Sequence, residues 1–495
     1  MNILLIGVGY HARRIYVPFF FETNAPAHLC AGVDIQSQEA VVTEYLAKEK
    51  YLLPMVYLNP DAPFEKLLDD VVKKYKIDAV IISTEPLTHF KYAMWALARN
   101  LHILMDKPVS TKKNVANSET QARELAEEYE TLKRTYLPLK KKMLVFSLMA
   151  QRRFHPAYKF MHDRIQEVFQ ETNCPVTSIQ AFHCDGQWRL PTEIIEQNYH
   201  PYNQGYGKLS HSGYHIIDMV VWLVQAAQSS VKKITGADVY SKFIRPADFN
   251  YQLSMADHEK ILPDFKTYNK FTDSEFAAKT KTFGEIDAFS TIAFRAGDKI
   301  SSLASINMGH NGFSQRNWGT VAGRDLYKGN GRVRQEQYFI EQGPFQSISL
   351  LTYQSKEVLK ESSDLYRIGG EHHLEVHVFR NSTLIPHWKT YERFSLEKIE
   401  NLGYMRGHQE DARRAGILDF ISAIQNKREA ESDFLDHEVS TKLLSAMYTS
   451  NLRGEQGKNP VVNVDLSRGG FTRQKKYWDA ISAAIVVHNP FKLKK

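Results

Sequence analysis

A lysine stands where a buried strand is expected to end. The segment "NLHILMDKPVST", residues 100–111, runs from an apolar stretch into Asp106, Lys107 and Pro108. Residues 103–105 have the continuous apolar character of a strand in a parallel sheet, and a Lys-Pro step ends its hydrogen-bonded ladder. Open sheets of this kind bind ligands at the carboxyl ends of their strands. Lys107 is therefore predicted to face a ligand.

A second pattern with chemical meaning is the glycine-rich turn "GVGYHA", which follows the apolar segment "NILLI". In such a turn, backbone amides at the start of a helix accept the negative charge of a pyrophosphate. The position between a strand and a helix favours a dinucleotide over a chance pair of turn glycines. The residues expected to contact the cofactor here are Gly7, Gly9, Tyr10, His11 and Ala12.

An acid follows at the expected distance. Asp34 ends the second predicted strand, "LCAGVD". A carboxylate there accepts hydrogen bonds from a ribose 2′-hydroxyl and repels a 2′-phosphate. No arginine follows it directly, so the sequence predicts NAD in preference to NADP.

The elements that must position these residues alternate between strand and helix over the first 150 residues. This alternation predicts an α/β domain, a Rossmann doubly wound parallel sheet that binds NAD. After residue 151 the pattern changes to alternating strands such as "VTSIQAF", "AFSTIAF" and "LEVHVF". We expect an α+β domain over residues 151–453, with a mostly antiparallel open sheet and insertions. Residues 454–495 are expected to form a carboxyl-terminal tail.

Composition narrows the class of protein. The 63 Lys and Arg residues exceed the 56 Asp and Glu residues by seven, but they are scattered, which disfavours nucleic acid as a partner. Three cysteines without metal-ligand spacing favour a reducing cytoplasm over a disulfide framework. No apolar stretch reaches the roughly 20 residues of a membrane span, so neither a signal peptide nor an anchor is expected.

Several motifs in order carry a family resemblance. Gly7, Gly9 and Ala12, then "TEPLTHFKYAMWALARN" and "MDKPVS", resemble the family of glucose-fructose oxidoreductase, inositol dehydrogenase and MocA. Downstream, "WRLP" and "GKLSHSGYHIIDMVVWL", at 188–191 and 207–223, are similar to that family's Trp-Arg segment and histidine helix. The resemblance implies a sugar or polyol substrate and a homo-oligomer, dimer or tetramer.

The resemblance also implies roles for individual residues. Lys107 matches the family's Glu-Lys-Pro lysine, with Asp106 in place of the glutamate, and His215 matches the motif histidine. His211 stands where the family usually has its first aspartate. Further cofactor contacts are expected at Thr84, Pro86, His89, Asp106 and Lys107. Substrate contacts are expected at Lys107, Arg153, Trp188, Arg189, His211 and His215.

These residues suit the oxidation of a secondary alcohol, which needs a base for the hydroxyl proton and a positive group at the oxygen. We assign His215 as acid and base and Lys107 as the charge that polarises the oxygen, with His211 as a further catalytic residue. On one helix, His211, His215 and Asp218 would share a face and form a relay or a purely structural trio, and we expect no metal there.

Two other functions are compatible with these motifs. A glycoside hydrolase or lyase of the same superfamily would keep its NAD and oxidise a sugar transiently. A non-catalytic sensor would bind nucleotide and signal through a partner, but it would not need both Lys107 and His215. The leading interpretation is an NAD(P)-dependent dehydrogenase acting on CH-OH groups.

Overall fold

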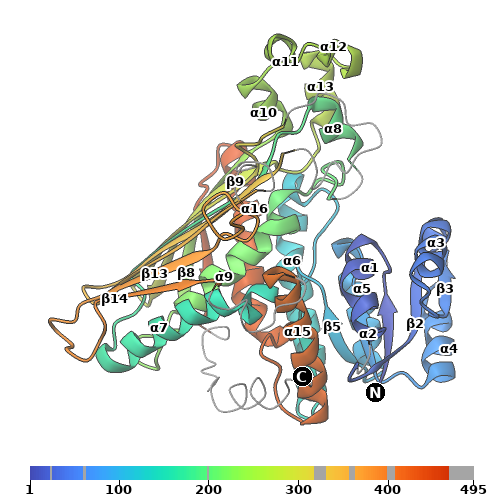
Figure 1. Ribbon diagram of the computed structural model, residues 1–495, viewed down its shortest axis with the longest axis horizontal. Helices are drawn as coiled ribbons and strands as arrows, with labels where there is room; N and C mark the ends of the chain where they lie inside the picture. Colours follow the sequence, from blue (N-terminus) through green and yellow to red (C-terminus); the bar gives the residue numbers. More distant parts are fainter. Residues whose placement is uncertain are drawn as a thin grey trace.

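Two sheets of different kinds make up the chain. The computed structural model describes residues 1–22, 25–59, 63–197, 200–316, 331–355, 363–397 and 407–467. Figure 1 shows a smaller sheet near the amino terminus and a larger, steeply inclined sheet, with helices α6 and α16 between them. Helix α6 spans Glu119–Lys140 and α16 spans Glu438–Glu455, and the two pack against each other.

The amino-terminal sheet is the predicted Rossmann sheet. Its strands pair in the order β3-β2-β1-β4-β5-β6, and all five pairs are parallel. The strands are β1 (Asn2–Ile6), β2 (His28–Ile35), β3 (Met55–Leu58), β4 (Ala79–Ile82), β5 (His102–Met105) and β6 (Phe146–Leu148). The order reverses between β1 and β4, so the loops that follow these strands diverge there and leave room for a ligand.

Helices cover both faces of this sheet, as the alternating pattern requires. Those that follow the strands are α1 (Tyr10–Arg14), α2 (Tyr16–Phe20), α3 (Glu39–Glu49), α4 (Glu65–Tyr75), α5 (His89–Ala98) and α6. One face also receives α15 (His408–Gln425), whose Ile417, Phe420 and Ile421 join the same apolar cluster as Ile3 and Leu5 of β1. Residues far along the chain therefore complete the amino-terminal core.

The second sheet has nine strands in the order β14-β13-β12-β11-β7-β10-β9-β8-β15. Its strands are β7 (Ser178–Gln187), β8 (Gly236–Ile244), β9 (Asp287–Ala296), β10 (Lys299–Asn311), β11 (Val333–Gln342), β12 (Gln346–Ser355), β13 (Glu375–Arg380), β14 (Tyr391–Ser395) and β15 (Val462–Asp465). Only β7 and β10 pair in parallel among these strands. The expected mostly antiparallel sheet is confirmed. Strand β15 falls within the segment expected to be a tail, and residues 468–495 lie outside the described residues.

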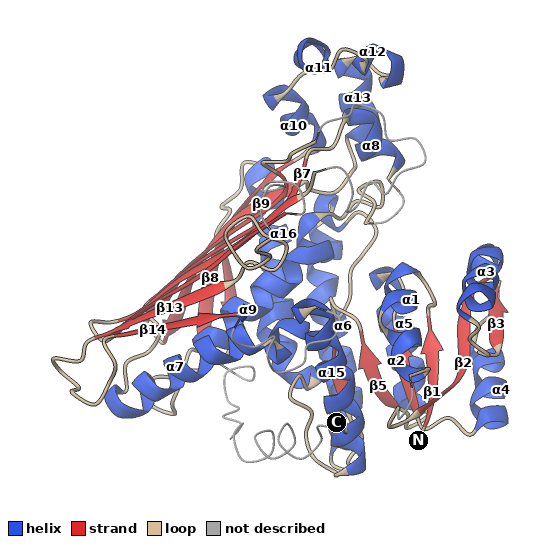
Figure 2. Cartoon of the chain, viewed as in Figure 1, coloured by secondary structure: helices blue, strands red, loops and turns tan. Residues whose placement is uncertain are grey.

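One face of this sheet is buried and the other is open. Helices α7 (Pro156–Thr172), α9 (Tyr214–Gln225) and α16 pack on the buried face. Among the described residues, Figure 2 shows no helix on the opposite face. Pairing across the strands brings exposed apolar side chains together on that face: Tyr240, Phe289, Leu303, Phe339, Phe379 and Tyr391.

Short helices extend one end of the large sheet. They are α8 (Pro191–Glu196), α10 (Pro246–Gln252), α11 (Met255–Ile261), α12 (Phe265–Tyr268) and α13 (Asp273–Thr280), at the top of Figure 1. Their apolar side chains form a separate small cluster around Leu190, Phe249, Phe265 and Phe276. Within the described parts of the chain, no helix is both long enough and apolar enough to span a membrane.

Candidate active site

A cavity of about 970 Å³ lies at the carboxyl edge of the parallel sheet, and residues of the buried face of the large sheet form its opposite wall. At its nucleotide end it is lined by Gly7, Gly9, Tyr10, His11, Asp34, Thr84 and Pro86. Its inner end is lined by Arg14, Asp106, Lys107, Arg152, His183, Asp185, His200, His211, His215, Arg332, Arg334, Glu410 and Arg413. A cavity at this edge is where the fold class places its ligand.

The glycine turn has the geometry that a dinucleotide needs. Gly7 has φ +90°, and a Cβ there would lie 2.4 Å from the Ser83 carbonyl oxygen, so the position requires glycine. Gly9 immediately precedes α1, and nothing lies within 4 Å of where its Cβ would be. A phosphate group can thus come close to the backbone at the start of the helix.

Backbone amides hold the Asp34 carboxylate in place at the cavity. Its carboxylate accepts bonds from the backbone N–H groups of Val8 and Ile35, both at 2.7 Å. Burial raises the pKa of Asp34, and these two bonds and the charge of Arg13 oppose that rise. Together with the glycine turn, this acid makes the nucleotide end a fit for a dinucleotide such as NAD.

Two predicted cofactor residues do not line the cavity. Ala12 is buried in the apolar core behind the turn. The ring of His89 is buried, with Nδ1 2.8 Å from the Pro108 carbonyl oxygen and Nε2 3.1 Å from that of Thr84. His89 therefore joins the loops that follow β4 and β5. Its role toward a cofactor would be to position those loops.

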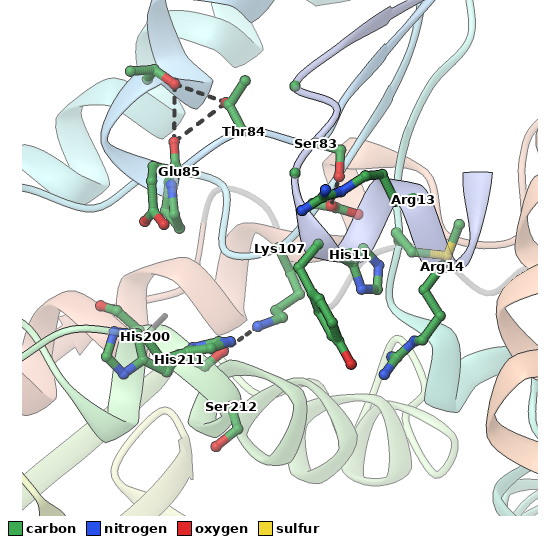
Figure 3. A pocket seen from close by; sticks show the side chains of 18 of the residues that line it. His11, Arg13, Arg14, Ser83, Thr84, Glu85, Lys107, His200, His211 and Ser212 are labelled. Atoms are coloured by element: carbon green, nitrogen blue, oxygen red, sulfur yellow. Dashed lines mark hydrogen bonds between the residues drawn. The ribbon is translucent and has the colours of Figure 1, made fainter. Parts of the chain in front are cut away.

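Lys107 reaches across the cavity from the end of β5. Its Nζ donates a hydrogen bond to the backbone oxygen of His211, as Figure 3 shows. The preceding Asp106 accepts bonds from Tyr16 at 2.5 Å and from Ser83 at 2.6 Å, which fixes this edge of the sheet. Burial lowers the pKa of Lys107 to about 8. The amine therefore carries a proton at neutral pH but can lose it a little above.

The structure brings both candidate histidines to the same cavity. His211 lies in a wide π turn, Leu209–Gly213, that leads into α9, and His215 lies in the first turn of α9. Burial holds the pKa of His215 well below its usual value, and the charges of Lys107 and Arg152 add to that effect. His215 is thus a neutral imidazole able to accept a proton. Neither ring nitrogen of His211 has a hydrogen-bond partner among the described residues.

The expected relay through Asp218 is not assembled. Asp218 turns away from the cavity to Arg153, which donates to it through Nε at 2.9 Å and Nη2 at 2.7 Å. The Nδ1 atom of His437 lies 3.1 Å from the same carboxylate. The π turn breaks the regular helical spacing that would have stacked His211, His215 and Asp218 on one face.

Three residues expected to touch the substrate lie outside the cavity lining. Arg153 is neutralised by Asp218 in the protein interior. Trp188 donates its ring N–H to His258 Nε2 at 3.3 Å, and Arg189 donates through Nη1 to the Tyr202 hydroxyl at 2.5 Å. In this structure Arg153, Trp188 and Arg189 are therefore not among the residues that line the cavity.

The sequence patterns did not single out several charged residues of the inner end. Asp185 is buried and accepts bonds from Lys208 at 2.7 Å, Ser212 at 3.1 Å and Arg332 at 2.8 Å. Although burial opposes it, the charge of Lys208 keeps the pKa of Asp185 well below its usual value. The spacing of His183 and Asp185 is a weak signal, because residues two apart in a strand point to the same face of a sheet.

Residues 1–137 match the family model described as an oxidoreductase family with an NAD-binding Rossmann fold, GFO_IDH_MocA. The sequence has no match among curated proteins.

Several solved structures share the fold over almost the whole chain. Levoglucosan dehydrogenase, solved with NADH and levoglucosan, is 15% identical with a TM-score of 0.55, over 94% of this chain and 100% of the other. Aldose-aldose oxidoreductase from Caulobacter crescentus is 12% identical with a TM-score of 0.53, over 94% and 99% of the two chains. Scyllo-inositol dehydrogenase from Lactobacillus casei is 12% identical with a TM-score of 0.52, over 94% and 98%.

The family match covers the amino-terminal domain, and the structural matches share the fold over both sheets. The resemblance inferred from the glycine turn and the Asp-Lys-Pro segment is thereby confirmed. Residues 1–137 of this chain are therefore similar to the Gfo/Idh/MocA oxidoreductase family, whose model describes an NAD-binding Rossmann fold.

Proposed function

We propose that this protein is an NAD-dependent dehydrogenase that oxidises a secondary alcohol of a sugar, cyclitol or sugar derivative. The observation that carries the proposal is the convergence of Lys107 and His215 in one cavity with the glycine turn and Asp34. A dinucleotide at the turn would extend toward Lys107. The levoglucosan bound in one matching structure, and the inositol in the name of another matching enzyme, support the same substrate class.

In this proposal the two side chains divide the work. Lys107, protonated at neutral pH, hydrogen-bonds the alcohol oxygen and stabilises the negative charge that develops on it. His215, neutral because it is buried, accepts the hydroxyl proton and returns it in the reverse reaction. NAD, when bound, supplies the hydride acceptor.

The proposal includes a preference for NAD. The Asp34 carboxylate can accept hydrogen bonds from both ribose hydroxyls, but it repels a phosphate at the 2′ position. Arg13, which also lines the cavity, offsets part of that repulsion. We therefore expect discrimination between NAD and NADP to be finite and to depend on Asp34.

The direct test follows the absorbance of reduced nicotinamide while the purified protein is incubated with NAD and a panel of sugars, polyols and their derivatives. Sustained reduction with one class establishes the dehydrogenase. Bound cofactor without net reduction by any member, together with release of a leaving group from a glycoside, would instead indicate redox-neutral chemistry.

We further propose that the open face of the large sheet joins copies of the chain. Its exposed aromatic side chains, among them Phe289, Phe339 and Phe379, lie on one continuous surface. Apolar area of this kind is uncommon on a monomer. Light scattering coupled to size-exclusion chromatography should show a dimer or tetramer, and Phe339→Glu should lower the molar mass. A monomeric wild-type protein would contradict this assembly.

A further inference from the structure

We propose that the substrate carries an anionic group, a carboxylate or a phosphate, which Arg152 and Arg334 bind beside the reacting alcohol. The inference rests on the proposed function and specifies its substrate class. It rests on the charges at the inner end of the cavity and on Arg152, which has one hydrogen-bond donor without a partner among the described residues.

The cavity lining has more cationic than anionic groups. Eight of the lining residues are cationic and five are carboxylates: Arg13, Arg14, Lys91, Lys107, Arg152, Arg332, Arg334 and Arg413 against Asp34, Glu85, Asp106, Asp185 and Glu410. Immediately behind this lining, Lys208 pairs with Asp185 and Glu336 pairs with Arg152, so those two groups cancel. An excess of positive charge therefore faces the space that a substrate would enter.

Protein carboxylates already engage some of these cations. Arg332 donates to Asp185 through Nη2 at 2.8 Å and to its backbone oxygen through Nε at 2.9 Å. Arg413 and Arg14 share Glu410, at 3.2 Å and 3.5 Å. Arg14 lies on α1 close to the glycine turn, where a pyrophosphate would compete for it. These residues are less suited to bind a substrate than the pair described next.

Arg152 and Arg334 both depend on one buried carboxylate. Glu336 is fully buried, and Arg152 donates to it through Nε at 2.8 Å and Nη2 at 2.6 Å. Arg334 donates to the same carboxylate at 3.1 Å. Two guanidinium groups thus share a single negative charge. The hydroxyls of Tyr158 and Tyr338 also donate to Glu336, so its acceptor capacity is heavily used.

One donor of Arg152 is left over. The Arg152 side chain is only 3% exposed, and its Nη1 has no hydrogen-bond partner within the part of the chain that the structure describes. A buried donor without a partner is costly, and a guanidinium group is suited to carboxylate and phosphate oxygens. A bound anion would accept this hydrogen bond and balance the shared charge.

The same charge acts on the reacting groups. Burial is the main cause of the lowered pKa of Lys107 and His215, and the charge of Arg152 lowers both pKa values further. An anionic substituent at Arg152 would relieve that effect when substrate binds. It would also orient the sugar, because the anion and the reacting hydroxyl would be fixed at two separate points.

The experiment compares matched ligands that differ in charge. Binding to the NAD-loaded protein is measured by isothermal titration calorimetry, and kcat/KM is measured in parallel, for glucose, glucuronate and glucose 6-phosphate and for inositol and an inositol phosphate. We expect at least one anionic member to bind about tenfold or more tightly than its neutral counterpart. The carboxylate and phosphate arms identify which anion the site accepts.

Two variants locate the effect. Arg334→Gln removes one guanidinium but leaves the bidentate Arg152–Glu336 pair, so the fold should persist. It should raise KM for the anionic ligand about tenfold and raise KM for its neutral counterpart by a clearly smaller factor. Arg152→Lys keeps a positive charge beside Glu336 but removes the spare Nη1 donor. It should weaken the binding of the same anionic ligands. Arg123→Gln, on the exposed surface of α6, is the control.

The outcomes separate this inference from the proposed function. The anion site is overturned if neutral sugars are turned over and no anionic member binds more tightly than its neutral counterpart. It is also overturned if Arg334→Gln lowers kcat/KM equally for anionic and neutral ligands. Either result leaves the dehydrogenase intact. Tight binding of an anionic sugar without hydride transfer overturns the dehydrogenase and supports the site. If the anionic ligands do not bind at all, the inference is wrong.

Discussion

The two ends of the cavity are built in different ways. The nucleotide end uses backbone amides of the loop after β1 and one acid at the carboxyl end of β2, so these parts are close in sequence. The inner end collects Lys107, Arg152, Asp185, His215 and Arg334 from separate elements and relies on buried charge. The nucleotide end thus depends on local sequence, whereas the inner end depends on residues that only the fold brings together.

The largest effect is expected at the inner end. Lys107→Ala removes the positive charge that polarises the alcohol, and kcat should fall by about a thousandfold. NAD affinity, measured by calorimetry, should change little because the glycine turn and Asp34 remain. Lys113→Ala, an exposed lysine in the same loop, is the matched control. Comparable turnover in the two variants would remove Lys107 from the mechanism.

The nucleotide end can be tested through its two glycines. Gly7→Ala places a Cβ in a left-handed backbone conformation and against Ser83, and the free energy of unfolding should fall by about 2–3 kcal/mol. Gly9→Ala meets no protein atom, so stability should persist while NAD binding weakens. Denaturant unfolding and calorimetry separate the two effects. Loss of stability in both variants would show that Gly9 serves the fold and not the cofactor.

Cofactor choice should depend on a single side chain. Asp34→Ala removes the acceptor for the ribose hydroxyls and the repulsion of a 2′-phosphate, so KM for NAD should rise about tenfold while KM for NADP falls. Asp70→Ala, an exposed acid on α4, should leave both values unchanged. If the ratio of kcat/KM for the two cofactors does not change, the selectivity depends on Arg13 or its neighbours and not on Asp34.

The pH dependence should show smaller changes but test the roles of the two groups. Lys107 must be protonated to polarise the oxygen, so kcat/KM should decline as pH rises above about 8. His215 must be neutral to accept a proton, and its lowered pKa places the acid limb well below pH 6.5. A rate that rises through pH 8 would exchange the roles, with Lys107 as the base.

The sequence predicted the nucleotide end well because its signals are local. The glycine turn lies between a strand and a helix, and the acid lies at the end of the next strand. Both can be recognised from residues close to them in the sequence. Lys107 and His215 were identified through short motifs, and the structure brings both to the cavity. The sequence analysis chose Arg153 and missed Arg152. The two arginines are adjacent and point in different directions, so Arg153 pairs with Asp218 while Arg152 lines the cavity.

Long-range pairing explains the rest. Glu336 of β11 lies opposite His183 of β7, and this antiparallel register brings Arg334 near Asp185. No local pattern predicts which strand pairs with which, so the charged wall of the inner end could not be read from sequence. In an extended segment Arg332, Arg334 and Glu336 share one face, but the alternation does not say what that face meets.

Helix α15 has a consequence for how the chain is made. Its apolar residues complete one face of the amino-terminal sheet, and Arg414 pairs with Glu22 there. During synthesis, the dinucleotide-binding domain must therefore wait for residues beyond 420 before its core is closed. We expect a ribosome-bound chain of the first 150 residues to expose that apolar face and to require a chaperone. The two halves of this protein should mature together.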